Sequence, residues 1–327
     1  MPISKIENSS IEDTAIHGAR NLIINGNFDV WQRGTSFSNA NNVYTADRFK
    51  VVAGGGTTGD TVSQQSFTAG QTDVPNEPTY FLRYAAGGTS SNKVMHHRIE
   101  DVRTGAGKTC TLTFYAKAST GHTSTVEVAQ VFGSGGSSQV TQSAQNYTMT
   151  TSWQKFTFTI ALPSISGKTI GTSSYVYIAF IRSLSSSNVS IDIAQMQFEV
   201  GEQATPFEHE SYAATLQKCQ RYYLQICNGS GDVISTGSFL AGGANQIRGA
   251  VQFPVEMRAA PTVISNSGSG YFDLEGVTNF TGPMLIAYNN TRSCLLYYTN
   301  PSALTNGLAG LLRSSNASAS LALQAEL

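Results

Sequence analysis

The sequence contains 327 residues, and a chain of this length usually forms about two domains. Its formal net charge is -1 and its 20 basic residues are scattered along the chain, which argues against an electrostatic surface for nucleic acid or anionic lipid. No run of about eighteen apolar residues occurs, and residues 1–20 are polar, so the sequence predicts neither membrane insertion nor a secretory signal. We therefore expect the protein to be made in a cytoplasm.

Short segments rich in β-branched and aromatic residues alternate with clusters of Gly, Ser, Asn and Pro, which predicts an all-β chain. In Thr111-Leu-Thr-Phe-Tyr-Ala116 and Phe156-Thr-Phe-Thr-Ile160 every second residue is apolar, which indicates strands with one buried and one solvated face. Strands of this number and length are typical of an antiparallel jelly-roll β-sandwich. The predicted strands before residue 201 are Asn21–Phe28, Arg48–Ala53, Thr61–Phe67, Thr79–Tyr84, Lys93–Glu100, Cys110–Ala116, Ser124–Phe132, Gln154–Ala161, Tyr175–Ile181 and Val189–Val200.

Between Glu210 and Tyr223 the spacing of apolar residues becomes helical, with Tyr212, Leu216 and Cys219 on one face. This pattern predicts a short linker helix followed by a second, smaller β-sandwich domain. The strands predicted there are Tyr222–Cys227, Gly249–Glu256, Thr262–Ser265, Gly270–Glu275, Met284–Tyr288, Cys294–Thr299 and Ser318–Glu326. The predicted domain organisation is a leader over 1–20, a jelly-roll domain over 21–205, a linker with the helix over 206–226 and a C-terminal β-domain over 227–327.

Motifs of known enzyme classes are absent or incomplete. Gly105-Ala-Gly-Lys-Thr109 ends like a phosphate-binding loop, but position 102 is Val and a strand follows, so no helix N-terminus faces a phosphate. No G-x-S-x-G pentad occurs. His96 and His97 are adjacent in a predicted strand, so they should point to opposite faces and cannot share a metal. We expect no catalytic residue, although carboxylates from distant strands could still form the acid pair of a glycosidase.

The four cysteines are Cys110, Cys219, Cys227 and Cys294, and none forms a C-x-x-C pair. We interpret them as small buried apolar residues rather than as zinc ligands or disulfide partners.

Aromatic, amide and guanidinium side chains that could bind a small polar ligand are concentrated in two places. An aromatic face beneath an apolar patch, with planar amides and fixed donors around it, is the usual composition of a sugar site. Each tryptophan could equally pack in the core, and both interpretations stay open. The candidate ligand-binding residues are Trp31, Gln32, Arg33, Tyr44, Arg48 and Trp153.

Several segments resemble a known family. Asn21-Leu-Ile-Ile-Asn-Gly-Asn-Phe28, Trp31-Gln-Arg-Gly34 and Thr45-Ala-Asp-Arg-Phe49 resemble the start of the jelly-roll domain of bacteriophage tail-fibre and virion-appendage proteins, which is similar to carbohydrate-binding modules. Gly107–Lys117, Ser152–Thr157 and Ile191–Glu202 resemble later strands of that module. Ala204-Thr-Pro-Phe-Glu208 and Cys219-Gln-Arg-Tyr-Tyr223 resemble the junction to a C-terminal domain. The resemblance covers about residues 1–225.

The resemblance implies a non-enzymatic virion protein, a tail fibre that attaches to the host by binding a cell-surface glycan. It also implies a homotrimer that contacts other virion or tail proteins, with residues 1–20 docking onto the particle. In related modules a structural Ca²⁺ lies near the positions of Asn27 and Asp192; otherwise we expect no cofactor. The alternatives are a virion adaptor, head fibre or decoration protein without affinity for sugar, and, third, an enzyme that degrades a polysaccharide.

Overall fold

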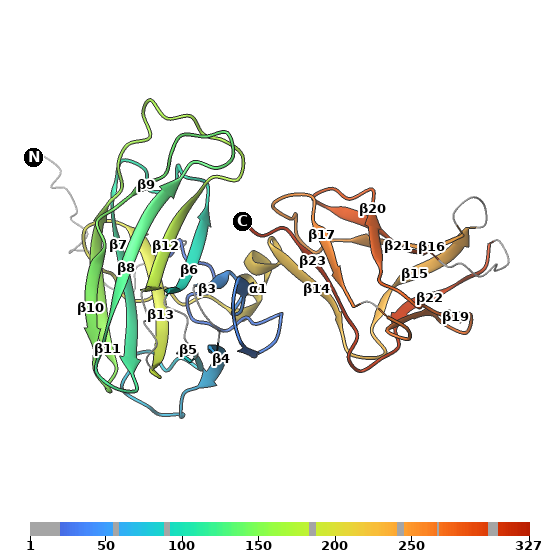
Figure 1. The fold of residues 1–327 in the computed structure, drawn as a ribbon, viewed down its shortest axis with the longest axis horizontal. Helices are drawn as coiled ribbons and strands as arrows, with labels where there is room; N and C mark the ends of the chain where they lie inside the picture. Colours follow the sequence, from blue (N-terminus) through green and yellow to red (C-terminus); the bar gives the residue numbers. More distant parts are fainter. Residues whose placement is uncertain are drawn as a thin grey trace, which may run out of the picture. The chain divides into compact units, whose positions relative to one another are not determined.

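The computed structural model describes residues 20–54, 59–87, 92–182, 188–240, 245–266, 268–299 and 307–327. The expected leader, except for its last residue, lies outside this part of the chain. The chain divides after Ser211 into two compact units, residues 1–211 and 212–327. Both consist of antiparallel sheets, as the alternating sequence pattern predicts, and α1 (Tyr212–Gln220) is the one helix among the described residues (Figure 1).

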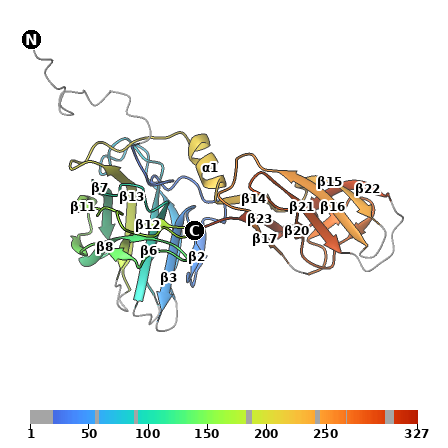
Figure 2. The ribbon, with the colours of Figure 1, turned by 90° about the horizontal axis from the view of Figure 1, so that it is seen from above.

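Two sheets form the first unit and lie in two layers (Figure 2). The strand order is β1-β4-β5-β13-β7-β11 in the six-stranded sheet and β10-β8-β12-β6-β3-β2 in the seven-stranded sheet, where β9 also pairs with β8. The strands are β1 (Ser36–Ser38), β2 (Val43–Tyr44), β3 (Phe49–Gly54), β4 (Thr61–Ser66), β5 (Tyr80–Ala85), β6 (Asn92–Glu100), β7 (Thr109–Ala118), β8 (His122–Val131), β9 (Val140–Thr141), β10 (Gln145–Met149), β11 (Gln154–Ala161), β12 (Tyr175–Arg182) and β13 (Ser190–Val200).

The core of the first unit lies between the two sheets. Every second residue of β7 is directed into it, including Leu112 and Phe114, as the alternation in the sequence predicts. Phe49 of the opposite sheet is fully buried there and contacts the ring of Phe180, with 5.7 Å between the ring centroids. This continuous core fixes which residues of each strand face outward.

The predicted strand Asn21–Phe28 is wrong. The segment forms a turn, in which Asn25 and Phe28 have φ values of 64° and 57°. The side-chain N–H of Asn25 donates to the Val30 carbonyl oxygen at 2.8 Å, and the side-chain oxygen of Asn25 accepts the N–H of Val30 at 3.0 Å. Gly26 lies so close to β13 that a Cβ atom there would be 2.0 Å from the Met196 carbonyl oxygen. The apolar run therefore enters the core without the extended backbone that its composition suggests.

The segment that follows β13 folds back onto the outer face of the six-stranded sheet. The backbone N–H and hydroxyl of Thr205 donate to the two carboxylate oxygens of Glu199, at 2.9 and 2.6 Å. The N–H of Glu208 donates to the Gln197 side chain at 2.7 Å, and the Glu208 carboxylate accepts the N–H of Asn21 at 2.7 Å. We call these contacts the latch; they join the two ends of the described part of the first unit.

The helix α1 begins the second unit. Its buried residues are Thr215 and Cys219, whereas Tyr212 is 58% exposed. The helix predicted from the apolar spacing is present, but its buried face includes a threonine and leaves the first tyrosine in solvent. All four cysteines of the chain are free and buried, which confirms their interpretation as small apolar residues.

The second unit contains a three-stranded sheet, β14-β23-β17, and a seven-stranded sheet, β19-β18-β22-β15-β16-β21-β20, around a separate core. The strands are β14 (Tyr223–Asn228), β15 (Val233–Leu240), β16 (Gln246–Gln252), β17 (Thr262–Ser265), β18 (Phe272–Leu274), β19 (Thr278–Asn279), β20 (Leu285–Ala287), β21 (Ser293–Thr299), β22 (Ala309–Ser314) and β23 (Ser320–Gln324). The sequence predicted neither β15, which has a glycine at its middle, nor β22. A Cβ on Gly237 would lie 3.1 Å from Leu274, so the core leaves little room there.

Candidate functional site

The outer face of the seven-stranded sheet in the first unit carries aromatic side chains next to charged ones. On β12, Val176 and Ile178 are buried in the core, so Tyr175 and Tyr177 point outward on the same face. Both tyrosines are half-buried. Two outward rings, two residues apart on one strand, form a hydrophobic platform with hydroxyl groups at its edge.

Side chains of β6 lie against both rings. The register pairs Tyr177 with Arg98, and the Arg98 guanidinium carbon lies 4.6 Å from the centroid of the Tyr175 ring. The His96 ring lies 4.8 Å from that of Tyr177, at an angle of 42°. A guanidinium over a tyrosine face gains a cation–π attraction, which favours an ordered Arg98 side chain.

An ion pair borders the other side of Tyr177. Glu127 of β8 pairs with Arg182, and these side chains are 17% and 38% exposed. Burial, with the negative charge of Glu127 as the second cause, raises the pKa of the Tyr177 hydroxyl to about 12. This hydroxyl therefore stays protonated at neutral pH and can donate a hydrogen bond.

His96 is the most unusual polar group of this face. It is 2% exposed, and neither ring nitrogen has a hydrogen-bond partner within the described ranges. Burial, followed by the charges of Arg98 and Lys50, lowers the pKa of His96 to about 3. The imidazole is therefore neutral at physiological pH and offers one donor and one acceptor. A buried polar group without a partner has a free-energy cost that an added hydrogen bond would remove.

The polar margin of this face lies at β8 and β10. The Thr125 hydroxyl donates to the Asn146 amide oxygen at 2.9 Å, and the hydroxyls of Thr123 and Thr148 are 2.8 Å apart. We use the name tyrosine face for Tyr175, Tyr177, His96, Arg98, Glu127 and Arg182 together. It combines apolar rings, fixed donors and acceptors, and hydroxyl groups at its rim.

Trp31, the first candidate from the sequence, packs in the core. It is 8% exposed, and its indole N–H donates to the Phe28 carbonyl oxygen at 2.7 Å. Its ring stacks on Phe37 with 6.4 Å between centroids. A role of Trp31 in binding a ligand remains a prediction, because these contacts describe packing only.

Gln32, Arg33, Tyr44 and Arg48, which the sequence also proposed, gather near Asp47. The Asp47 carboxylate accepts the N–H of Gln32 at 3.0 Å and lies 3.7 Å from the Arg33 guanidinium. The Arg33 guanidinium carbon lies 5.1 Å from the Tyr44 ring centroid. Arg48 is 1% exposed, has a φ of 73°, and donates to the carbonyl oxygen of Arg98 at 2.7 Å. Arg48 therefore supports the backbone of β6 at Arg98.

Trp153 lies apart from the other candidates, on the outer face of the six-stranded sheet. Its ring is 5.3 Å from that of Phe67 and 5.4 Å from that of Phe81, and the Lys117 ammonium lies 5.1 Å from its centroid. The structure thus does not bring the two tryptophans of the sequence into one site.

Asn27 and Asp192 do not fit a shared calcium site. The Asp192 carboxylate accepts two hydrogen bonds from Arg83, at 2.7 and 2.8 Å, and lies 3.8 Å from the Lys117 ammonium. Two cations beside this carboxylate oppose the binding of a third. The carbonyl of Gly26 accepts the N–H of Met196, four residues beyond Asp192, so Asn27 lies roughly 10 Å along the strand from Asp192.

Sequence reasoning considered His96 but none of the other residues of the tyrosine face, which are Tyr175, Tyr177, Arg98, Glu127 and Arg182. His97 is directed inward, 5.1 Å from the Phe49 ring centroid, while His96 lies outside against Tyr177, so the predicted opposite orientation of the two histidines is confirmed. The alternation Tyr175-Val-Tyr177-Ile178 in a predicted strand contained the signal for the two outward tyrosines. Glu127 and Arg182 come together only through the register of the sheet.

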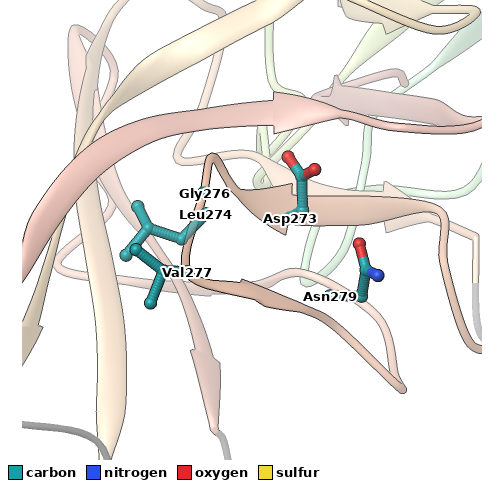
Figure 3. Close-up of a pocket in the computed structure, with 5 residues that line it drawn as sticks. All are labelled: Asp273, Leu274, Gly276, Val277 and Asn279. Atoms are coloured by element: carbon teal, nitrogen blue, oxygen red, sulfur yellow. The ribbon is translucent and has the colours of Figure 1, made fainter.

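A shallow cavity of about 250 Å³ lies in the second unit at the hairpin of β18 and β19. Asp273 and Asn279 lie on one side of the hairpin, and Leu274 and Val277 are directed to the other (Figure 3). Arg313 pairs with the Asp273 carboxylate at 3.0 Å. The carboxylate is thus engaged in an internal ion pair, which favours a structural role for this hairpin.

Across the described segments, no group of three or more His, Cys, Asp or Glu side chains is arranged to hold a metal ion. No helix in the same segments is long and apolar enough to cross a membrane.

Comparison with solved structures finds weak likenesses. One chain, described as CBM4, is 17% identical, with coverage of 54% of this chain and 98% of its own and a TM-score of 0.33. The enzymatically active domain of tailspike protein 4 from bacteriophage CBA120 is 16% identical, with coverage of 53% and 23% and a TM-score of 0.35. The family 11 carbohydrate-binding module from Clostridium thermocellum, in complex with a β-1,3-1,4-mixed-linked tetrasaccharide, is 14% identical, with coverage of 54% and 97% and a TM-score of 0.31. No protein-family model and no curated protein matches the sequence.

Proposed function

We propose that this protein is a non-enzymatic attachment protein of a bacteriophage particle, a tail fibre whose first unit binds a host-surface glycan at the tyrosine face. The observation that carries the proposal is the pair of outward-facing rings of Tyr175 and Tyr177 on β12, with the Arg98 guanidinium over the first ring and the Glu127–Arg182 ion pair on the same face. A sugar ring would place its C–H patch on the tyrosine rings and its hydroxyls on the Glu127–Arg182 pair.

The state of the ionisable groups on this face supports binding without catalysis. Glu127 is paired with Arg182, and the pKa of His96 lies far below the range in which an imidazole shuttles protons at neutral pH. The virion role rests on the sequence segments that resemble tail-fibre and virion-appendage proteins. In a homotrimer, three weak sites would act together through their high effective concentration.

The test is binding of the purified full-length chain to immobilised lipopolysaccharide, capsular polysaccharide and mixed-linkage β-glucan, with reducing ends measured in parallel. Light scattering of the same sample gives the number of subunits. Tyr177→Ala should weaken binding about tenfold, which corresponds to about 1.4 kcal/mol. The matched control is Tyr288→Ala, because Tyr288 is 81% exposed in the second unit and lies outside the proposed site.

Binding that depends on Tyr177 and not on Tyr288 would support the proposal. Equal binding by both variants would exclude the tyrosine face as the site. Release of new reducing ends would overturn the non-enzymatic assignment, and a chain that binds none of the polysaccharides would instead fit a virion adaptor or decoration protein.

A further inference from the structure

Lys93 and Asp60 form an ion pair in which neither side chain has any exposed surface. The Lys93 ammonium nitrogen lies 2.7 Å from Oδ1 of Asp60, and both side chains are 0% exposed. Lys93 belongs to β6 of the seven-stranded sheet, and Asp60 immediately precedes β4 of the six-stranded sheet. Lysine and aspartate are almost never fully buried unless they are paired, and here each is the buried partner of the other across the two layers.

Both groups are fixed by further hydrogen bonds. The Tyr84 hydroxyl donates to Oδ2 of Asp60 at 2.8 Å, and the N–H of Gly87 donates to Oδ1 at 2.8 Å. The Lys93 ammonium also donates to the carbonyl oxygen of Gly87. The nitrogen of the lysine is therefore held against Oδ1 of the aspartate, with little freedom to move away.

A pair of charges in an apolar interior loses the hydration that stabilises it in water. Attack by the lysine nitrogen requires that one proton first pass from the ammonium to the carboxylate, which gives a neutral amine beside a neutral carboxylic acid. These are the two partners of an amide condensation, and groups held in contact react as if at very high concentration. We propose that Lys93 and Asp60 are joined by an intramolecular isopeptide bond that crosslinks the two sheets.

The reaction is a balanced condensation. Nζ of Lys93 attacks Cγ of Asp60, and the Cγ–Oδ1 bond breaks. Of the three ammonium hydrogens, one stays on the amide nitrogen and two leave with Oδ1 as one water molecule. Oδ2 becomes the amide carbonyl oxygen, and the Tyr84 hydroxyl, already in contact with it, stabilises the negative charge that develops there during the attack.

Tyr84 suits this role because its hydroxyl stays protonated. Burial, with Asp60 as the second cause, raises the pKa of Tyr84 above its usual value. The core around the pair also excludes water, which disfavours hydrolysis of the bond once it has formed.

The test is the intact mass of the full-length chain, measured under denaturing conditions. The expected mass is one water molecule below that of the sequence. A tryptic digest should contain a branched peptide that joins the Asp60 segment to the Lys93 segment, because trypsin does not cleave after an acylated lysine. Lys93→Met and Asp60→Ala should each restore the full mass, and Tyr84→Phe should leave part of the chains without the crosslink.

The matched control within the chain is Lys117 with Asp192, an ion pair at 3.8 Å whose lysine is 31% exposed, and which should give no branched peptide. A full-length chain with the complete mass of its sequence, and normal cleavage after Lys93, would overturn the proposal and leave a simple buried ion pair. Loss of water that persists in both Lys93→Met and Asp60→Ala would overturn it as well.

Discussion

Replacing Trp31 with alanine separates a packing role from a ligand role at the most distinctive residue of the N-terminal motif. The side chain is 8% exposed, and truncation of a buried tryptophan costs about 3–5 kcal/mol. A domain of this size is stabilised by about 5–15 kcal/mol, so the first unit should remain folded in water but unfold at a much lower urea concentration. This cost includes the loss of the hydrogen bond from the indole N–H of Trp31 to the Phe28 carbonyl oxygen.

Trp31→Phe is the control, because it keeps an aromatic ring and removes only the indole donor, at a cost of about 1 kcal/mol. The assay is urea unfolding followed by tryptophan fluorescence. The chain has two tryptophans, so Trp153 alone reports in both variants. If Trp31→Ala lost less than about 1 kcal/mol of stability yet no longer bound polysaccharide, the assignment of Trp31 to the core would be refuted.

Three further predictions concern other parts of the chain. The pKa of His96 is about 3 in the folded chain against 6.5 for an unperturbed histidine, so the unfolded chain takes up more protons between these values and stability falls as the pH drops. The free energy of unfolding, measured in urea between pH 7 and pH 4, should therefore fall less steeply with decreasing pH for His96→Gln, by at most about 1.4 kcal/mol per pH unit, and identical slopes would contradict the burial of a neutral His96. Gly237→Ala should destabilise the second unit by about 1–3 kcal/mol, because its Cβ would be only 3.1 Å from Leu274; an unchanged melting curve would show that this core can adjust. Addition of EDTA should leave the melting temperature unchanged, since Arg83 already neutralises Asp192, and a lower melting temperature would instead establish a structural calcium ion.

Much of the fold follows from the period-two pattern of the sequence. Apart from Asn21–Phe28, each predicted strand overlaps a strand of the structure, because burial of one face imposes alternation on residues such as those of β11. In β7 the alternation is present, but Thr111 and Thr113 on the face expected to be solvated are buried too. β10 and β22 were not predicted, and two of the other errors have local causes. The turn around Asn25 depends on a side-chain amide that bonds the backbone of Val30, and β15 contains a glycine where the core leaves little room for a side chain.

The candidate site was less predictable, because the register of the sheet assembles it. His96 and Glu127 both pair with Ala179, although 31 positions of sequence separate them. No local motif encodes such a neighbourhood. The residues around Trp31 and Asp47 drew attention in the sequence as a possible ligand site. Their side chains instead form hydrogen bonds and ion pairs with one another and with the backbone, so the structure of this segment requires these residue types.

The latch determines how the first unit would respond to mechanical tension. The N–H of Asn21 and the carboxylate of Glu208 are in direct contact, so the chain enters and leaves this unit at neighbouring points. A pulling force applied along the polypeptide would act first on this hydrogen bond and on the Thr205–Glu199 contacts, which would have to break one after another before load reached the strands. The sandwich would thus be shielded from moderate tension, and residues 21 and 208 provide a suitable place to rejoin the chain in a circular permutant.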